Sequence, residues 1–148
     1  MTDYNVLNKQ LKEIVEGVPH RIANLANASA LLFNTLENLN WAGFYLLDGD
    51  KLVLGPFQGK VACTIIPIGR GVCGTAVAEN RTVVVQNVHN FNGHIACDSN
   101  SLSEIVVPIR VDGKIVAVLD VDSPLENRFT EKDRTGLEQF AHLIETIW

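Results

Sequence analysis

Long apolar runs and clusters of basic residues are both missing from this 148-residue chain. No apolar stretch approaches the roughly 18 residues that a membrane-spanning helix needs, so we expect no membrane partner. Acidic residues outnumber basic ones, 17 to 12, and the formal net charge is −5. Nucleic-acid binders gather Lys and Arg to displace counterions from phosphates. Because the sequence has no such cluster, we expect no nucleic-acid partner either.

Cysteine is also scarce, since the chain has only Cys63, Cys73 and Cys97. An odd count does not suit a framework of structural disulfides. The first ten residues carry charges where a secretory signal peptide has its apolar core, which predicts a cytoplasmic protein with reduced thiols. The three thiols are then core residues, metal ligands or redox groups.

The composition, 47% hydrophobic and 20% charged, is that of an ordinary globular protein. A chain of this length suits one domain, 1–148, which buries roughly 68–70% of its unfolded surface and needs no metal or disulfide for its core. Apolar residues recur with helical spacing over 7–18, over 21–39 and again near the C-terminus, where Thr130 and Asp133 resemble a capping box.

Between these helices the pattern predicts short strands and one short helix. We expect strands over 41–48, 51–57, 63–66 and 82–86, a hairpin of 104–110 and 114–122, and the helix over 75–79. This order predicts an α+β fold: a central, mainly antiparallel sheet flanked by N-terminal and C-terminal helices.

The segment 87–101 has no periodicity and is rich in Asn, Gly and Ser. Loops of this length in a compact domain are usually functional or disordered. Cys97 lies near its end, three residues after His94, and an accessible thiol beside a possible cation is where thiolate character is expected. A cysteine that is oxidised to a sulfenic acid also needs a second thiol to regenerate it.

Two other interpretations of the thiols stay open. Cys63 and Cys73 lie in small, apolar contexts typical of inert core residues. Alternatively, His94 and Cys97 have ligand-like spacing and could join Cys63 and Cys73 in a zinc site. No Cys-x-x-Cys pair supports that alternative, so we expect no metal and no other cofactor.

Acidic side chains end the last predicted strand. Asp120 and Asp122 point to one face, about 6.6 Å apart, and Val116 and Val118 precede them on that face. Two buried acids are costly unless a cation or a hydrogen-bonding group meets them, and the ammonium group of a ligand would do so. The alternative is a strand end that emerges into solvent.

The hairpin register decides whether Glu104 joins them. A three-residue loop places Glu104 opposite Asp120 on the same face, whereas a two-residue loop places it opposite Val121 on the other face. In the first case three carboxylates converge, and crowding raises their pKa so that one could act as an acid.

Trp41 and Tyr45 are four residues apart on a predicted strand and therefore share a face. They are either an aromatic wall for an apolar or sulfur-bearing group or ordinary core residues.

Together these residues resemble a known family. The element order resembles a GAF domain over nearly the whole chain, and more narrowly the sequence is similar to the free methionine-(R)-sulfoxide reductases. The matching motifs are Asn-Trp-Ala-Gly-Phe-Tyr at 40–45, Gly-Val-Cys-Gly-Thr at 71–75, His-Ile-Ala-Cys-Asp at 94–98, Ser-Glu at 103–104 and Leu-Asp-Val-Asp-Ser at 119–123.

The resemblance implies a role for each thiol. The enzyme would convert free L-methionine (R)-sulfoxide to L-methionine through a sulfenic acid on Cys97. Cys63 would resolve that acid as an intramolecular disulfide, and Cys73 would be an additional thiol. A thioredoxin-like dithiol would recycle the disulfide, and the protein would be a homodimer.

It also implies roles for the other side chains. Glu104, Asp120 and Asp122 would hold the substrate, and Glu104 or Asp122 would protonate the sulfoxide oxygen. Trp41 and Tyr45 would line the site. The alternative is a non-catalytic GAF module that senses a small ligand and has no need of the cysteines.

Overall fold

The computed structural model describes residues 1–93 and 100–148. Its centre is a six-stranded sheet with the order β3-β2-β1-β6-β5-β4, in which the described pairings are antiparallel. The strands are β1 (Trp41–Asp48), β2 (Lys51–Gly59), β3 (Ile65–Pro67), β4 (Val83–Val85), β5 (Ser103–Val111) and β6 (Lys114–Ser123). This arrangement confirms the predicted α+β class.

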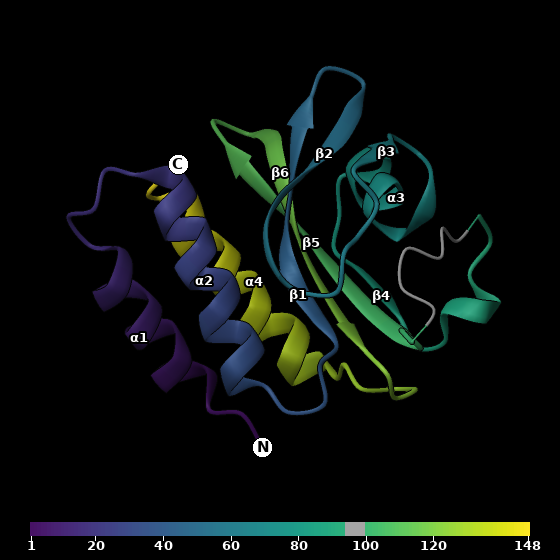
Figure 1. Cartoon of the computed structure of the whole chain (residues 1–148), viewed down its shortest axis with the longest axis horizontal. Coiled ribbons are helices and arrows are strands. Elements are labelled where there is room, and N and C mark those ends of the chain that lie inside the picture. The colour runs from purple at the N-terminus through teal and green to yellow at the C-terminus, as the bar shows by residue number, and fades with distance from the viewer. Residues whose placement is uncertain (94–99) are drawn as a thin grey trace.

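Three long helices lie on one side of the sheet: α2 (Arg21–Thr35) and α4 (Glu131–Glu145) pack on its strands, and α1 (Tyr4–Val15) packs against α2 and α4. The short helix α3 (Gly71–Glu79) and the 3₁₀ turn η1 (Val88–Asn90) lie on the other side (Figure 1). Among the described residues, no helix combines the length and the apolar character required to span a bilayer.

Alternation along the strands divides the core in two. On β1, Ala42 and Phe44 point to the long helices, whereas Trp41 and Tyr45 point to the side of α3. Because successive side chains of a strand face opposite ways, each face collects its own apolar cluster. The cluster beside α3 also receives Cys73, so it is the side on which the chemistry-bearing residues gather.

Several element ends differ from the prediction. Helix α2 stops at Thr35 and not at 39, because Leu36 is extended and Asn38 takes a positive φ of 59°. Helix α3 begins at Gly71 and not at 75, since packing against the sheet buries Val72 and Cys73 and overrides the weak helical propensity of their glycine neighbours. Strand β3 covers 65–67, which leaves residue 63 in the preceding loop.

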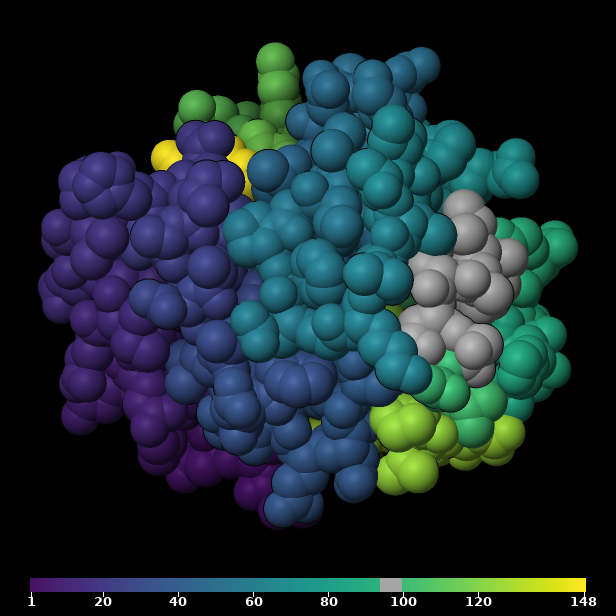
Figure 2. Space-filling model, in the orientation of Figure 1, coloured from purple at the N-terminus to yellow at the C-terminus, as the bar shows by residue number. Residues whose placement is uncertain are grey.

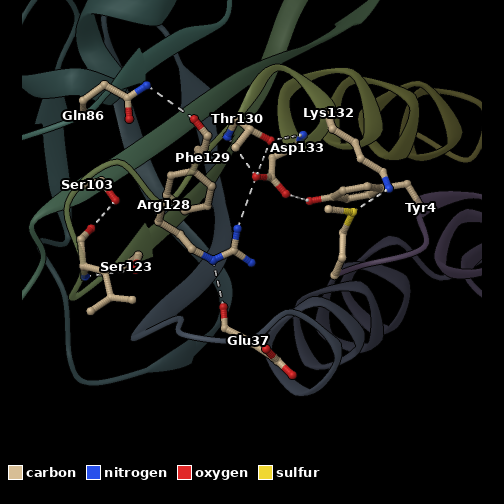
Figure 3. Close-up of polar contacts among 12 residues, drawn as sticks. Tyr4, Glu37, Gln86, Ser103, Ser123, Arg128, Phe129, Thr130, Lys132 and Asp133 are labelled. Atoms are coloured by element: carbon tan, nitrogen blue, oxygen red, sulfur yellow. Dashed lines mark hydrogen bonds and ion pairs between the residues drawn. The ribbon is translucent and has the colours of Figure 1, made fainter.

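A polar network joins the ends of the long helices (Figure 3). The predicted capping box is present: the Thr130 amide donates to Asp133 Oδ2 at 2.9 Å, and the Thr130 side chain accepts from the Asp133 amide. The Tyr4 hydroxyl donates to Asp133 Oδ1 at 2.7 Å, and Arg128 Nη1 lies 3.2 Å from Asp133 Oδ2. Arg128 Nε also donates to the Glu37 carbonyl at 3.0 Å, so one carboxylate ties α1 and the end of α2 to α4.

The network predicts an acid-sensitive contribution to stability. Burial by itself would raise the pKa of Asp133, but hydrogen bonds from Thr130 and Tyr4 and the charge of Arg128 outweigh it and lower that pKa. A carboxyl with a lowered folded pKa stabilises the protein above its unfolded pKa of about 3.9, and the contribution is lost as the pH falls through the folded pKa. We expect Asp133→Asn to lower the free energy of unfolding by about 1–3 kcal/mol at pH 7.

Urea denaturation of both proteins between pH 3 and pH 7 measures this contribution. The difference between wild type and Asp133→Asn should narrow below about pH 4. Glu131→Gln is the matched control, because Glu131 lies in the same helical turn with a side chain 85% exposed, and it should change little. A difference that stays constant with pH would contradict the assignment.

Close packing at Gly136 gives a second prediction for the fold. Gly→Ala in a helix interior normally stabilises by about 1 kcal/mol. A methyl group at Gly136 would overlap the Tyr4 ring, so Gly136→Ala should instead destabilise the protein by about 1–3 kcal/mol. In a Tyr4→Ala background, Gly136→Ala should no longer destabilise the protein, because the ring that the new methyl group would overlap is absent. Thermal unfolding of the four proteins tests this, and additive effects would refute it.

Candidate active site

The β5–β6 hairpin brings Glu104 to the same face as Asp120 and Asp122 by a register that neither predicted loop gives. The loop has two residues, 112–113, both with positive φ, and Val111 pairs with Lys114. A two-residue loop by itself would place Glu104 opposite Val121.

A shift in the pairing register between β5 and β6 changes the partner of Glu104. The partner of Arg110 is Ile115 whereas that of Ile109 is Ala117, so Val116 is an extra residue, as in a β-bulge. Glu104 therefore pairs with Asp122, and the three-residue loop with Glu104 opposite Asp120 is wrong. Val116 packs against the helix-side core, so the prediction that it shares the acidic face is also wrong.

Glu104, Asp120 and Asp122, here called the carboxylate cluster, are buried. Their exposed fractions are 8%, 5% and 9%, which excludes the alternative that this strand end emerges into solvent. Asp120 Oδ1 is buried and accepts no hydrogen bond from the described residues. A buried acceptor without a donor is costly, so a cationic or hydrogen-bonding group placed here would be stabilised.

Burial changes the protonation of this cluster. Burial raises the pKa of Glu104 well above its ordinary value, and the charge of Asp120 and a hydrogen bond with it add to the rise. Burial also raises the pKa of Asp120, and the neighbouring charge of Asp122 increases the effect. Like charges held together in a dry site favour protonated carboxyls near neutrality, which is the property of a general acid.

An aromatic wall, formed by Trp41, Tyr45 and Phe57, stands beside the cluster. In the β1–β6 pairing Trp41 is opposite Asp122 and Gly43 is opposite Asp120. The Trp41 ring stacks on Tyr45 at 5.8 Å and on Phe57 at 5.1 Å between centroids. Trp41 and Tyr45 are each only 2% exposed, so they are packed as core residues are. Their position beside the carboxylates also suits them to form a wall of the site.

The sequence did not reveal Phe57 as part of this wall. The register of β1 and β2 shifts between Gly43 and Tyr45, and an added side chain at Gly43 would overlap Phe57. Phe57 thus occupies space that the glycine leaves free. The Trp-Ala-Gly-Phe-Tyr motif contains the necessary glycine, but the strand shift that uses it depends on the partner strand.

Cys73 lies on α3, beside the carboxylate cluster. It is a free, buried thiol, and burial, followed by the charges of Asp120, Glu104 and Asp122, raises its pKa. Cys73 Sγ and one carboxylate oxygen each of Glu104 and Asp120 lie within 4.8 Å of one another, a set that could hold a metal ion. This set differs from the zinc site suggested by the sequence, which combined His94 and Cys97 with Cys63 and Cys73.

Cys63 lies in a loop and is disulfide-bonded. Cys63 is half-buried between β2 and β3, where its carbonyl accepts a hydrogen bond from the Tyr45 hydroxyl at 2.9 Å. His94 and Cys97 lie outside the described residues. In the space-filling view, the chain from β2 to α3 covers the central and upper part of the visible face (Figure 2).

Comparison with known proteins identifies the family. A model of the GAF domain matches residues 8–148. A free methionine-R-sulfoxide reductase of Escherichia coli is 53% identical over 144 residues, which cover 97% of this chain and 87% of that relative. This chain belongs to the family of free methionine-R-sulfoxide reductases. The resemblance found in its motifs is thereby confirmed.

Solved structures of other free methionine-R-sulfoxide reductases have the same fold. The Staphylococcus aureus protein in complex with substrate superposes with a TM-score of 0.95 at 54% identity, covering 99% of this chain and 96% of that one. The Neisseria meningitidis enzyme in complex with its substrate also gives a TM-score of 0.95, at 44% identity, with coverages of 99% and 91%.

The raised pKa values of the buried carboxyls predict that this cluster destabilises the folded protein as the pH rises. Groups whose folded pKa is raised contribute stability below the unfolded pKa of about 4, and it is lost as the pH rises through the folded pKa. Asp120→Asn removes one such charge, so it should raise the free energy of unfolding at pH 8 by about 0.5–2 kcal/mol and less at pH 5.

Urea denaturation at the two pH values tests this prediction. Asp48→Asn is the control, because its side chain is 71% exposed and should give no pH-dependent difference. A loss of stability in Asp120→Asn of the same size at both pH values would show that the carboxyl is a structural hydrogen-bonding group.

Proposed function

We propose that this chain reduces free L-methionine (R)-sulfoxide to L-methionine with Cys97 as the nucleophile. The observation that carries the proposal is a buried, protonatable carboxylate cluster beside an aromatic wall, in a chain of this family. Relatives at 44% and 54% identity whose structures contain a substrate support the same substrate class.

The chemistry needs one proton and transfers one oxygen. The Cys97 thiolate attacks the sulfoxide sulfur while Glu104 or Asp122 gives a proton to the sulfoxide oxygen. The oxygen passes to Cys97 as a sulfenic acid, so the substrate sulfur gains two electrons and the cysteine sulfur loses two. Methionine then leaves.

The second half of the cycle restores the thiol. Cys63 attacks the sulfenic acid, the oxygen departs as water, and a disulfide forms. A thioredoxin-like dithiol then exchanges with this disulfide and returns both cysteines to the reduced state. Cys73 is an additional thiol in this scheme, and its raised pKa favours a reserve role over direct attack.

Charge explains why the substrate would be the free amino acid. A carboxylate cluster that holds Asp120 and Asp122 suits an ammonium group, which offers a positive charge and three donors. In a peptide the same nitrogen is acylated and neutral, so it would leave the buried acceptors without a partner. The aromatic wall suits the methyl and thioether end, with Trp41 nearest the methyl group.

Turnover of each free epimer with a dithiol reductant tests the function. The wild type should consume the R epimer and leave both the S epimer and N-acetylmethionine sulfoxide unchanged. Cys97→Ser should lose activity by at least about 10³-fold, since no other group supplies the nucleophile. Cys73→Ser is the comparison, and it should keep single-turnover formation of methionine.

A Cys97→Ser protein that still consumes methionine sulfoxide would end the enzyme proposal. A wild type that binds the sulfoxide without converting it would favour the sensor alternative. The homodimer and the cytoplasmic location stay predictions, which sedimentation and fractionation of cells can test.

A further inference from the structure

We propose that Tyr45 is a positioning residue for Cys63, through the hydrogen bond that its hydroxyl donates to the Cys63 carbonyl. The inference rests on the proposed function, in which Cys63 resolves the sulfenic acid. It adds that one side chain of the aromatic wall controls the rate of disulfide formation.

The loop that carries Cys63 has no regular structure of its own. It leaves β2 at Gly59, and three hydrogen bonds between described residues hold it before β3. Trp41 Nε1 donates to the Lys60 carbonyl at 3.2 Å, the Tyr45 hydroxyl to the Cys63 carbonyl at 2.9 Å, and the Leu54 amide to the Thr64 carbonyl at 2.9 Å. Two of these three donors are side chains of β1.

The loop is only partly buried. Val61 is 89% exposed and Thr64 is also exposed, whereas Ala62 and Cys63 are half-buried against the apolar cluster beside α3. Cys63 is also disulfide-bonded, so in the reduced protein, where that covalent restraint is absent, the conformation of this short segment depends more strongly on hydrogen bonds such as these. Of the three, only the Tyr45 bond acts on the cysteine itself.

Tyr45 is well placed to act as a rigid donor. It is 2% exposed, stacks on Trp41, and its backbone is paired with β2 and with β6. A buried tyrosine hydroxyl requires a partner, and here that partner is the Cys63 carbonyl. Burial and the nearby charge of Asp120 raise the pKa of Tyr45, so the hydroxyl keeps its proton at working pH.

Disulfide formation is sensitive to this kind of restraint. The two Cα atoms must come within about 4.4–6.8 Å with a defined dihedral angle, so a loop that samples many conformations reacts more slowly. A misplacement of about 1 Å is enough to reduce the rate of a step that depends on orientation. Cleavage of the sulfoxide does not involve Cys63 and should not depend on the bond.

Tyr45→Phe tests the proposal because it keeps the ring and removes the hydroxyl. Rapid quenching without reductant measures methionine formed per enzyme, while thiol titration and a 1,3-diketone trap follow the disulfide and the sulfenic acid. Because Tyr45 also belongs to the aromatic wall, the readout is the ratio of the two rates: we expect Tyr45→Phe to slow disulfide formation about 3- to 10-fold more than it slows methionine formation. More sulfenic acid should then be trapped.

Tyr4→Phe is the matched control. It also removes a buried tyrosine hydroxyl, which donates to Asp133 Oδ1 at 2.7 Å on the helix side of the sheet. It should lower stability without changing the rate of disulfide formation. Trp41→Phe is a second variant should Tyr45→Phe not fold: it loses the donor to Lys60 and should slow disulfide formation to a smaller extent.

The outcomes separate the two proposals. A wild type that forms no methionine overturns the proposed function and this inference with it. If the wild type completes both steps, the positioning role alone is overturned by a Tyr45→Phe protein that forms the disulfide at the wild-type rate. It is also overturned if both steps slow equally, or if Tyr4→Phe slows disulfide formation as much.

Discussion

Three carboxyl groups buried on one face of a sheet are the constraint on which the rest of this structure depends. Each of them loses hydration on folding, and each repels the others when ionised. Burial and the neighbouring charges raise the pKa of Glu104 and of Asp120, which favours their protonated forms. In the proposed function, a substrate that brings its own positive charge and a basic oxygen would relieve both costs at once.

The two faces of the sheet bury different sets of residues. On one face, α1, α2 and α4 bury a large apolar core, and the Asp133 network fixes the helix ends against one another. On the other face a smaller apolar cluster surrounds the carboxylates. The larger apolar core thus lies on the face opposite the carboxylate cluster, and it offsets the cost of burying these acids.

Strand β1 connects the parts of the site. It lies in the middle of the sheet between β2 and β6, and its side chains form most of the aromatic wall. The same two residues, Trp41 and Tyr45, use their ring faces for stacking and their polar atoms to hold the loop that carries Cys63. In the proposed function, the substrate wall and the anchor of this loop would therefore be the same two side chains.

The sequence by itself determined the α+β class, the capping box at Thr130, the shared face of Trp41 and Tyr45, and the family, because alternation, capping and motifs are local. Tertiary structure decided what depends on partners. The bulge at Val116 places Glu104 opposite Asp122, the shift beside Gly43 lets Phe57 stack on Trp41, and packing starts α3 at Gly71. A register is a relation between two strands, so neither strand alone contains it.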